Sequence, residues 1–263
     1  SPSGLTFGDD GFHLKFENSG NMGLDSSGQG NNFTTNGDLK QALDTPSNVY
    51  ATWNPLQYGT YTAGSTTMAN GNLTFTSNET GGNYPIRYST LAVSTGKWYA
   101  EFKVTSPVGF TIGISDGLPN NYIAHTNAQE CGYYYDGRRF GFSTTEHDPW
   151  GNSFTTNDII GIAMDLDNNK LYFSKNGTYQ ESGNPTNGTN GITIPTSSTG
   201  VYHFAFGDRN STGQPGVSAN FGNGFFGTTA ITSAGSNGNG SLFEYDVPSG
   251  YYALNTKNIN TYG

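Results

Sequence analysis

The strongest hydrophobic pattern in the chain lies in residues 157–178. Apolar side chains occupy every second position there and predict a β-strand with one strongly apolar face: Ile160, Ile162, Met164 and Leu166. The polar run at 167–170 predicts a turn, and residues 171–174 predict the return strand of a hairpin. Asn176-Gly177 predicts a second tight turn of type I′, because both residues readily adopt positive φ.

The same alternation recurs along the chain. It predicts further strands at residues 98–104, 110–114, 202–206 and 217–221. Hairpins are predicted around Asn70-Gly71 and around Asp136-Gly137, and long polar loops are expected at 116–130 and 143–156. No helical periodicity extends beyond two turns. The pattern therefore predicts an all-β fold, a two-sheet antiparallel β-sandwich with loop-rich N- and C-terminal flanking segments.

Composition narrows the class of partner. The 263 residues include 38 Gly, 17 Tyr and 17 Phe, an aromatic content that favours a folded β-protein over a disordered chain. The net charge of −9 disfavours nucleic acid and anionic membranes as partners, because both are bound through Lys and Arg. No apolar run is long enough to span a bilayer. The single cysteine, Cys131, excludes an intrachain disulfide and is expected to be a small buried side chain.

Three segments resemble SPRY domains. Residues 157–177 resemble the central signature of the family, a Gly-Asp-x-Ile-Gly strand followed by a strand that ends in Lys-Asn-Gly. Residues 94–102 resemble its Tyr-x-Glu strand, and residues 217–222 resemble its closing Asn-Phe-Gly strand. The resemblance implies a concanavalin A-like sandwich, or jelly roll, that binds partners and is not an enzyme.

The flanking segments resemble parts of phage virion proteins. The run of Gly, Asp, Ser and Asn at 23–33 and the segment at 44–56 resemble a recurrent stretch ahead of SPRY-like domains, from which Trp53 departs. Residues 243–263 resemble the segment that ends such modules. The resemblance implies an N-terminal flanking segment (1–60) packed on a SPRY-like sandwich (61–228), followed by a loop and a closing strand (229–263). We expect the closing strand to pair with a short strand at 12–16, and the chain to be a module of a larger protein or a processed product.

Motifs for catalysis or metal binding are weak. Gly113-x-Ser115-x-Gly117 lacks the helix that follows a nucleophile elbow, and residues 165–176 lack the Gly and Glu of an EF-hand. Glu146-His147-Asp148 are adjacent, and adjacent side chains rarely converge on one metal ion. The clustered carboxylates of sandwich-type glycosidases are missing as well. We therefore expect no catalytic residues, no metal and no cofactor.

Aromatic and arginine side chains in loops, together with one aspartate, are the candidates for binding. They are Tyr133, Tyr134, Tyr135, Arg138, Arg139, Trp150, Asp208 and Arg209. Tyr, Trp and Arg are the residues most enriched at binding hot spots, and an exposed ring can also stack on a sugar. The competing interpretation is that alternate tyrosines belong to the core and that the arginine pair lies on a solvated turn.

The sequence thus favours a non-enzymatic structural or adhesion module on the surface of a phage virion, in a tail fibre, an appendage or a capsid decoration. Its expected partners are other virion proteins or a glycan or protein of the host surface, and self-association into a homo-oligomer is left open. The alternatives are a glycan-binding lectin-like domain, a polysaccharide depolymerase, and a cellular SPRY adaptor that binds peptides.

Overall fold

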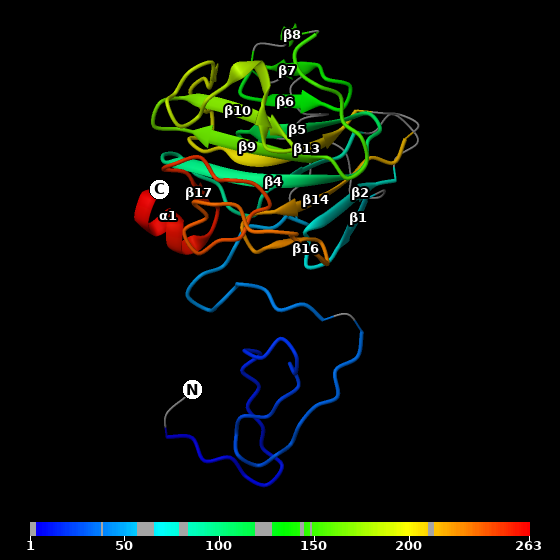
Figure 1. Ribbon diagram of the computed structural model, residues 1–263, viewed down its shortest axis with the longest axis vertical. Helices are drawn as coiled ribbons and strands as arrows, with labels where there is room; N and C mark the ends of the chain where they lie inside the picture. The colour runs from blue at the N-terminus through cyan, green and yellow to red at the C-terminus, as the bar shows by residue number, and fades with distance from the viewer. Residues whose placement is uncertain are drawn as a thin grey trace. The chain divides into compact units, whose positions relative to one another are not determined.

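The computed structural model describes residues 4–37, 39–56, 66–78, 84–118, 128–142, 145–147, 149–209 and 213–263 (Figure 1). Their contacts divide the chain into two compact units, Ser1–Leu43 and Asp44–Gly263. All strands and helices among the described residues lie in the larger unit. Residues 44–56, which the sequence placed in the N-terminal flank, therefore belong to the larger unit.

One sheet of the larger unit has nine strands. Its order is β1 (Thr66–Ala69), β2 (Thr74–Ser77), β14 (Gly216–Asn220), β4 (Lys97–Ser106), β9 (Ile159–Asp165), β10 (Lys170–Lys175) and β11 (Thr178–Tyr179), with β12 (Ile192–Thr193) on β10 and β17 (Tyr252–Ala253) on β4. The predicted hairpins at 66–75 and 157–175 are confirmed, because β1 pairs with β2 and β9 pairs with β10. Asn176 and Gly177 both have positive φ, 48° and 79°, as the predicted turn requires.

The second sheet has six strands. Its order is β3 (Ile86–Tyr88), β13 (His203–Asp208), β5 (Phe110–Ser115), β6 (Cys131–Tyr134), β7 (Arg139–Gly141) and β8 (Thr145–His147). A short hairpin of β15 (Phe225–Phe226) and β16 (Thr229–Ala230) lies outside both sheets. Part of the predicted loop at 116–130, residues 119–127, and residues 143, 144 and 148 of the next loop lie outside the described residues.

The main core lies between the two sheets. Alternate side chains of the nine-stranded sheet, such as Phe102 and Ile162, meet Ile112 and Phe204 of the six-stranded sheet in one buried cluster. The predicted two-sheet antiparallel sandwich is thereby confirmed. Trp53 is fully buried in this cluster and makes an edge contact with Phe221 at 5.6 Å between ring centroids. The residue that departs from the phage-like pattern is therefore part of the core.

The outer face of the nine-stranded sheet is also covered. Ala163 and Tyr172, on the side of the hairpin opposite to the predicted apolar face, pack with Phe243, Val247 and Tyr251 of the C-terminal segment. This second core explains why all seven residues of β9 are buried. The sequence predicted only one buried face, because the covering segment lies far away in the chain.

The prediction that the C-terminal strand pairs with residues 12–16 is wrong. β17 instead runs parallel to β4, with Tyr252 opposite Trp98 and Ala253 opposite Tyr99. The chain then forms α1 (Thr256–Tyr262), a helix capped by the Asn255 side chain, which accepts a hydrogen bond from the Asn258 backbone amide. The C-terminal segment thus pairs with the edge of β4 at Trp98 and Tyr99.

The smaller unit is held by polar contacts. The Asp25 carboxylate accepts hydrogen bonds of 2.7–2.9 Å from the backbone amides of His13, Ser27 and Asn31 and from the Ser27 hydroxyl. Desolvation alone would raise the pKa of Asp25, but these hydrogen bonds hold it well below its ordinary value. The strand predicted at 12–16 is reduced to one isolated bridge between Leu14 and Asp25, and the positive φ of Phe16 ends the extended backbone there.

Candidate functional site

The hairpin of β6 and β7 divides the predicted binding residues between its two faces. Because side chains alternate along a strand, Tyr133 and its partner Arg139 face the space between the sheets, whereas Tyr134 and Phe140 face outward. The sequence placed these tyrosines and arginines around one turn. The structure shows two separate groups, one on each side of the six-stranded sheet.

The outward group consists of Tyr134, Arg138, Phe140 and Arg209, which we call the arginine–aromatic cluster. The Arg209 guanidinium carbon lies 3.8 Å from the Phe140 ring centroid and 5.3 Å from that of Tyr134. The Arg138 guanidinium carbon lies 4.9 Å from the Tyr134 centroid and 5.3 Å from that of Phe140. The two rings meet edge to face at 5.3 Å. Two guanidinium groups thus stack on one pair of rings, an arrangement stabilised by cation–π attraction.

Ion pairs fix Arg138 in this cluster. Its side chain contacts Asp136 at 2.7 Å and Glu146 at 2.6 Å, and the hydrogen bonds to these carboxylates raise its pKa above the ordinary value. Burial raises the pKa of the Tyr134 hydroxyl as well. Tyr134, Arg138 and Arg209 are each half-buried, so the cluster presents part of its surface to solvent in a fixed arrangement.

The inward group consists of Tyr133, Arg139 and Trp150. Tyr133 is fully buried, and its hydroxyl donates a hydrogen bond of 2.6 Å to the Asn152 carbonyl. Its ring meets the half-buried Trp150 edge to face at 4.8 Å, and the Arg139 guanidinium carbon lies 5.7 Å from the Trp150 ring. Tyr133 therefore fits the competing interpretation, in which alternate tyrosines of this hairpin belong to the core.

Two glycines allow the loop at 149–152 to approach the hairpin. Gly137 has φ of 103°, and a Cβ atom on it would lie 2.4 Å from the Gly151 carbonyl oxygen. A Cβ atom on Gly151 would lie 2.4 Å from the Tyr133 hydroxyl. The backbone amide of Gly151 donates to the Gly137 carbonyl at 2.8 Å, which fastens the loop to the turn.

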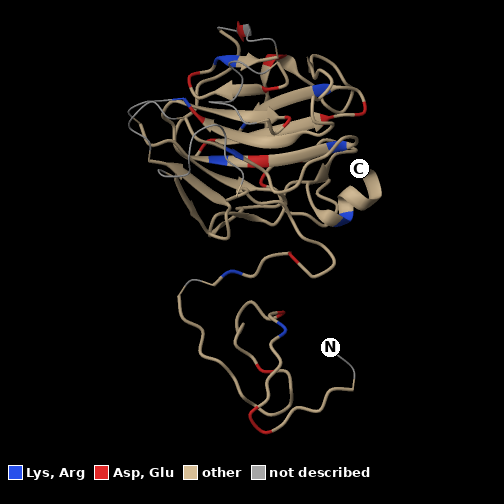
Figure 2. Cartoon of the chain, turned by 180° about the vertical axis from the view of Figure 1, so that it is seen from behind, with Lys and Arg blue, Asp and Glu red and all other residues tan. Residues whose placement is uncertain are grey.

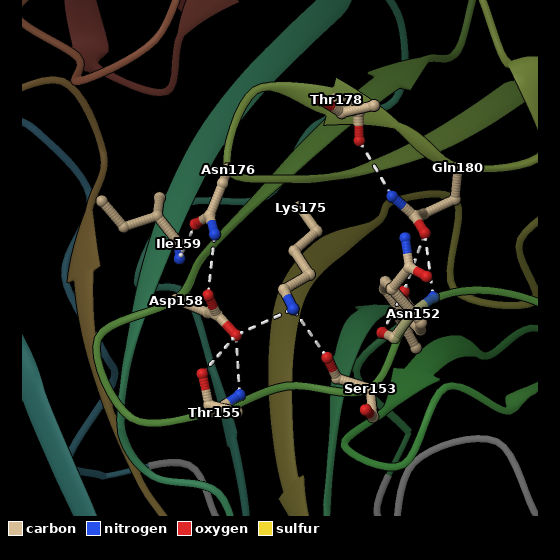
Figure 3. Close-up of polar contacts among 10 residues, drawn as sticks. Asn152, Ser153, Thr155, Asp158, Ile159, Lys175, Asn176, Thr178 and Gln180 are labelled. Carbon is tan, nitrogen blue, oxygen red and sulfur yellow. Dashed lines mark hydrogen bonds and ion pairs between the residues drawn. The ribbon is translucent and has the colours of Figure 1, made fainter.

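A groove of about 310 Å³ lies between residues 149–152 and residues 178–181. Its floor is the Gln180 side chain, which accepts a hydrogen bond from the Asn152 amide and donates one to the Thr178 carbonyl (Figure 3). Beside it, Lys175 reaches the Ser153 carbonyl at 2.8 Å and the Asp158 carboxylate at 3.0 Å. Asp158 also accepts a hydrogen bond from Asn176, so this network links the loop to the Asn176-Gly177 turn.

The remaining candidates, Asp208 and Tyr135, make contacts within the fold. Asp208 is fully buried at the end of β13 and accepts a hydrogen bond of 2.5 Å from the Ser77 hydroxyl. Tyr135 lies beside Tyr134 at 4.8 Å between ring centroids. Sequence reasoning missed Phe140 as a site residue, although its strand alternation places it on the Tyr134 face. It also missed Tyr179 and Gln180, which carry no local motif.

Several acidic and nucleophilic side chains of the sandwich form hydrogen bonds or ion pairs within the fold. Ser115 is buried and donates to Glu130 at 2.9 Å, and Asp165 pairs with Lys97 at 3.0 Å. Burial raises the pKa of the Cys131 thiol to about 11.

Charged residues are sparse over the strands (Figure 2). Among the described residues, no group of three or more His, Cys, Asp or Glu could hold a metal ion, and no helix could cross a membrane. Asp148 of the predicted Glu-His-Asp run lies outside the described residues.

Comparison with known proteins identifies the central part of the sandwich. Residues 97–192 match the family model of the SPRY domain. The match covers 96 of the 263 residues, and we call residues 97–192 the SPRY segment. This SPRY segment runs from β4 to β12 and contains the whole groove and all of the arginine–aromatic cluster except Arg209.

The curated relatives match about a third of the chain. Ran-binding protein 9 of Danio rerio is 32% identical over 91 residues, which are 33% of this chain and 15% of the relative. The dual specificity protein kinase splA of Dictyostelium discoideum is 32% identical over 108 residues, 38% of this chain and 4% of the kinase. The chain thus matches a small part of each relative's length.

Two solved SPRY structures are similar to the chain. The SPRY domain of human HERC1 has a TM-score of 0.49 at 16% identity, covering 64% of this chain and 96% of that domain. A second human SPRY domain has a TM-score of 0.42 at 15% identity, covering 56% and 90%. The SPRY match stops short of residues 23–56 and 243–263, where the resemblance to phage proteins stays a prediction.

Proposed function

We propose that the sandwich is a non-catalytic protein-binding module that recognises its partner through the arginine–aromatic cluster. The observation that carries this proposal is the stacking of Arg138 and Arg209 on Tyr134 and Phe140 at the surface of the six-stranded sheet. Arginine and tyrosine dominate binding hot spots because they combine a large apolar face with directed hydrogen bonds. The match of residues 97–192 to the SPRY family model supports the same interpretation.

The chemistry of the cluster favours a partner segment with carboxylates and a flat side chain. Guanidinium groups bind carboxylates through paired hydrogen bonds, and the ring edges around them accept apolar contacts. The chain carries a net charge of −9, and Asp136 and Glu146 offset the charge of Arg138, so the two arginines select an acidic segment at contact rather than by long-range steering. A partner carboxylate would exchange with Asp136 or Glu146, which already occupy the Arg138 side chain.

The finer setting that we propose is the surface of a phage virion. Its support is the resemblance of residues 23–33, 44–56 and 243–263 to virion modules. In that setting the partner is another virion protein or a molecule of the host surface, and weak single sites gain strength from the copy number of the particle. The engagement of Glu101, Asp165 and Asp158 in structural hydrogen bonds supports a binding rather than a hydrolytic role.

Selection from a random peptide library tests the binding proposal. We expect the immobilised module to enrich peptides that combine Asp or Glu with an aromatic residue, with dissociation constants of about 1–100 μM. The Arg138→Ala/Arg209→Ala variant should lose these peptides. The Lys170→Ala/Lys257→Ala variant, which removes the same charge elsewhere, should keep them. Enrichment of peptides that bind both variants equally well would place the binding surface elsewhere.

A separate experiment tests the virion setting. A fluorescent, multimerised copy of the chain is mixed with candidate bacterial hosts, with and without periodate oxidation of their surface glycans. Adhesion to bacterial cells supports the setting, and loss of adhesion after periodate identifies a glycan receptor. Absence of adhesion, together with absence of binding to purified phage particles, would contradict it.

A further inference from the structure

The groove between residues 149–152 and 178–181 lies on the other side of the hairpin from the arginine–aromatic cluster. Its two walls come from the loop before β9 and from β11 with the following turn. We propose that this groove is a second binding site, which holds the end of a neutral oligosaccharide. The proposal is independent of protein binding at the arginine–aromatic cluster, because it depends on different side chains.

The aromatic wall of the groove is held rigidly. Trp150 is half-buried, and its ring is packed edge to face against Tyr133 at 4.8 Å and Phe173 at 5.8 Å. Tyr179 of β11 borders the groove as well, with its ring packed edge to face against Tyr172 at 6.5 Å. An indole held in place by such contacts offers its remaining surface to the C–H face of a sugar ring without loss of conformational freedom on binding.

The floor of the groove is already formed in the free protein. Gln180 is buried, and its amide is fixed by the Asn152 amide and the Thr178 carbonyl (Figure 3). The Tyr133 hydroxyl holds the Asn152 carbonyl at 2.6 Å, and Lys175 holds the Ser153 carbonyl at 2.8 Å. Ligand sites of this size class are usually preformed in the same way.

Three polar side chains at the rim are left for a ligand. Asn152, Thr178 and Glu181 line the groove and are exposed, and their side chains form no hydrogen bond within the described part of the chain. Together they offer donors and acceptors of the kind that sugar hydroxyls need. Glu181 and the next residue, Ser182, both have positive φ, 53° and 54°. The turn that forms this wall of the groove is therefore strained.

The charge of the lining favours a neutral ligand. Residues 149–152 and 178–181 include one carboxylate, Glu181, and no Lys or Arg. Lys175 beside them is paired with Asp158, so the groove offers a phosphate or an acidic sugar no unpaired cation among its lining residues. A second hollow of about 470 Å³ also borders Tyr179 and is lined by Asn184, Thr186 and Asn237 among others. Because both hollows share Tyr179, a chain of several sugar units has a path across β11.

The three tryptophans make a direct test possible. Trp53 and Trp98 are fully buried, whereas Trp150 lines the groove, so the indole N–H signals in a ¹H–¹⁵N spectrum separate the site from the core. The full chain is titrated with cellotriose, mannotriose and N-acetylchitotriose up to about 10 mM, a range that detects millimolar affinity. We expect saturable movement of the Trp150 signal with at least one of them and no movement of the other two indole signals.

Variants and a charged probe complete the test. Asn152→Ala and Thr178→Val should each weaken the affinity at least about threefold without unfolding the chain, because neither side chain has a partner to lose. Asn260→Ala on the exposed side of α1 is the matched control and should bind as the wild type does. A Trp150 signal that stays still with all three sugars, or moves equally with trigalacturonic acid, overturns the proposal. Unchanged affinity in both groove variants also overturns it.

Discussion

Glu101 is a fully buried carboxylate in the middle of β4. It accepts hydrogen bonds of 2.8 Å from the backbone amides of Glu244 and Tyr245 and one of 3.1 Å from the Tyr99 hydroxyl. Burial raises its pKa to about 7, and the hydrogen bonds from the C-terminal segment only partly offset that effect. A single side chain thus connects the central strand to the segment that covers it.

We predict a pH-dependent stability that originates in Glu101. The folded-state pKa of about 7 is higher than the ordinary value of 4.5, so the folded state binds more protons between these values. The contribution to the free energy of unfolding is complete below about pH 4.5 and is lost as the pH rises through 7, by about 3 kcal/mol in total. Urea unfolding between pH 5 and 8 should show this loss in the wild type and a much smaller one in Glu101→Gln. Parallel pH profiles for the two proteins would contradict the assignment.

Two tyrosines with buried hydroxyl groups should respond oppositely to the loss of these groups. The Tyr179 hydroxyl is buried without a hydrogen-bond partner among the described residues, so Tyr179→Phe should leave the free energy of unfolding unchanged or raise it by about 1 kcal/mol. Tyr133→Phe removes a hydrogen bond to the Asn152 carbonyl and should lower it by about 1–2 kcal/mol. Chemical denaturation compares the two; a larger loss for Tyr179→Phe would be inconsistent with the structure.

At the residue scale, the sequence predicted which side chains belong to a candidate site better than it predicted which residues they contact. Tyr134 and Arg138 could be named because their types and their hairpin are local features. The stacking of Arg209 on Phe140 could not, because Arg209 follows β13 and Phe140 lies in β7, far apart in the chain. Gln180 was missed for a similar reason, since its partner Asn152 comes from another loop.

At the scale of elements, the β6–β7 turn depends on Gly137. Gly137→Ala would bring a Cβ atom to 2.4 Å from the Gly151 carbonyl, in addition to the strain of a positive φ. Gly188→Ala is the matched control, because Gly188 has φ of 81° and open space around it. We predict a loss of about 1 kcal/mol in the control and about 2–4 kcal/mol in Gly137→Ala, measured by thermal unfolding. Equal losses in the two variants would show that the loop at 149–152 can move away from the added Cβ atom without a loss of stability.

The strands could be predicted from the sequence because alternation and Asn-Gly turns act over short distances. β9, β10 and the turn at Asn176-Gly177 follow from residues that are adjacent in the chain. The parallel pairing of β17 with β4 depends on a contact between residues more than 150 positions apart, which no local pattern encodes. The same limit explains why the cover of the outer sheet face was missed.

At the scale of the whole molecule, the hydrophobic clusters lie in the larger unit. Each described cluster is built from residue 50 onward, whereas the smaller unit is organised around the Asp25 carboxylate and exposes Phe12, Phe16 and Phe33. We predict that residues 44–263 fold alone, with a midpoint of thermal unfolding within about 3 °C of the full chain. A fragment that lacks a cooperative transition would contradict this.

The affinity of a library-selected peptide is the most direct test of the central claim, that the arginine–aromatic cluster binds a protein partner. Isothermal titration, at a temperature where all three proteins are folded, should give a dissociation constant at least about tenfold weaker for Arg138→Ala/Arg209→Ala than for the wild type and the Lys170→Ala/Lys257→Ala control. Equal affinities in all three proteins would show that the partner is bound elsewhere and that the cluster only stabilises the hairpin.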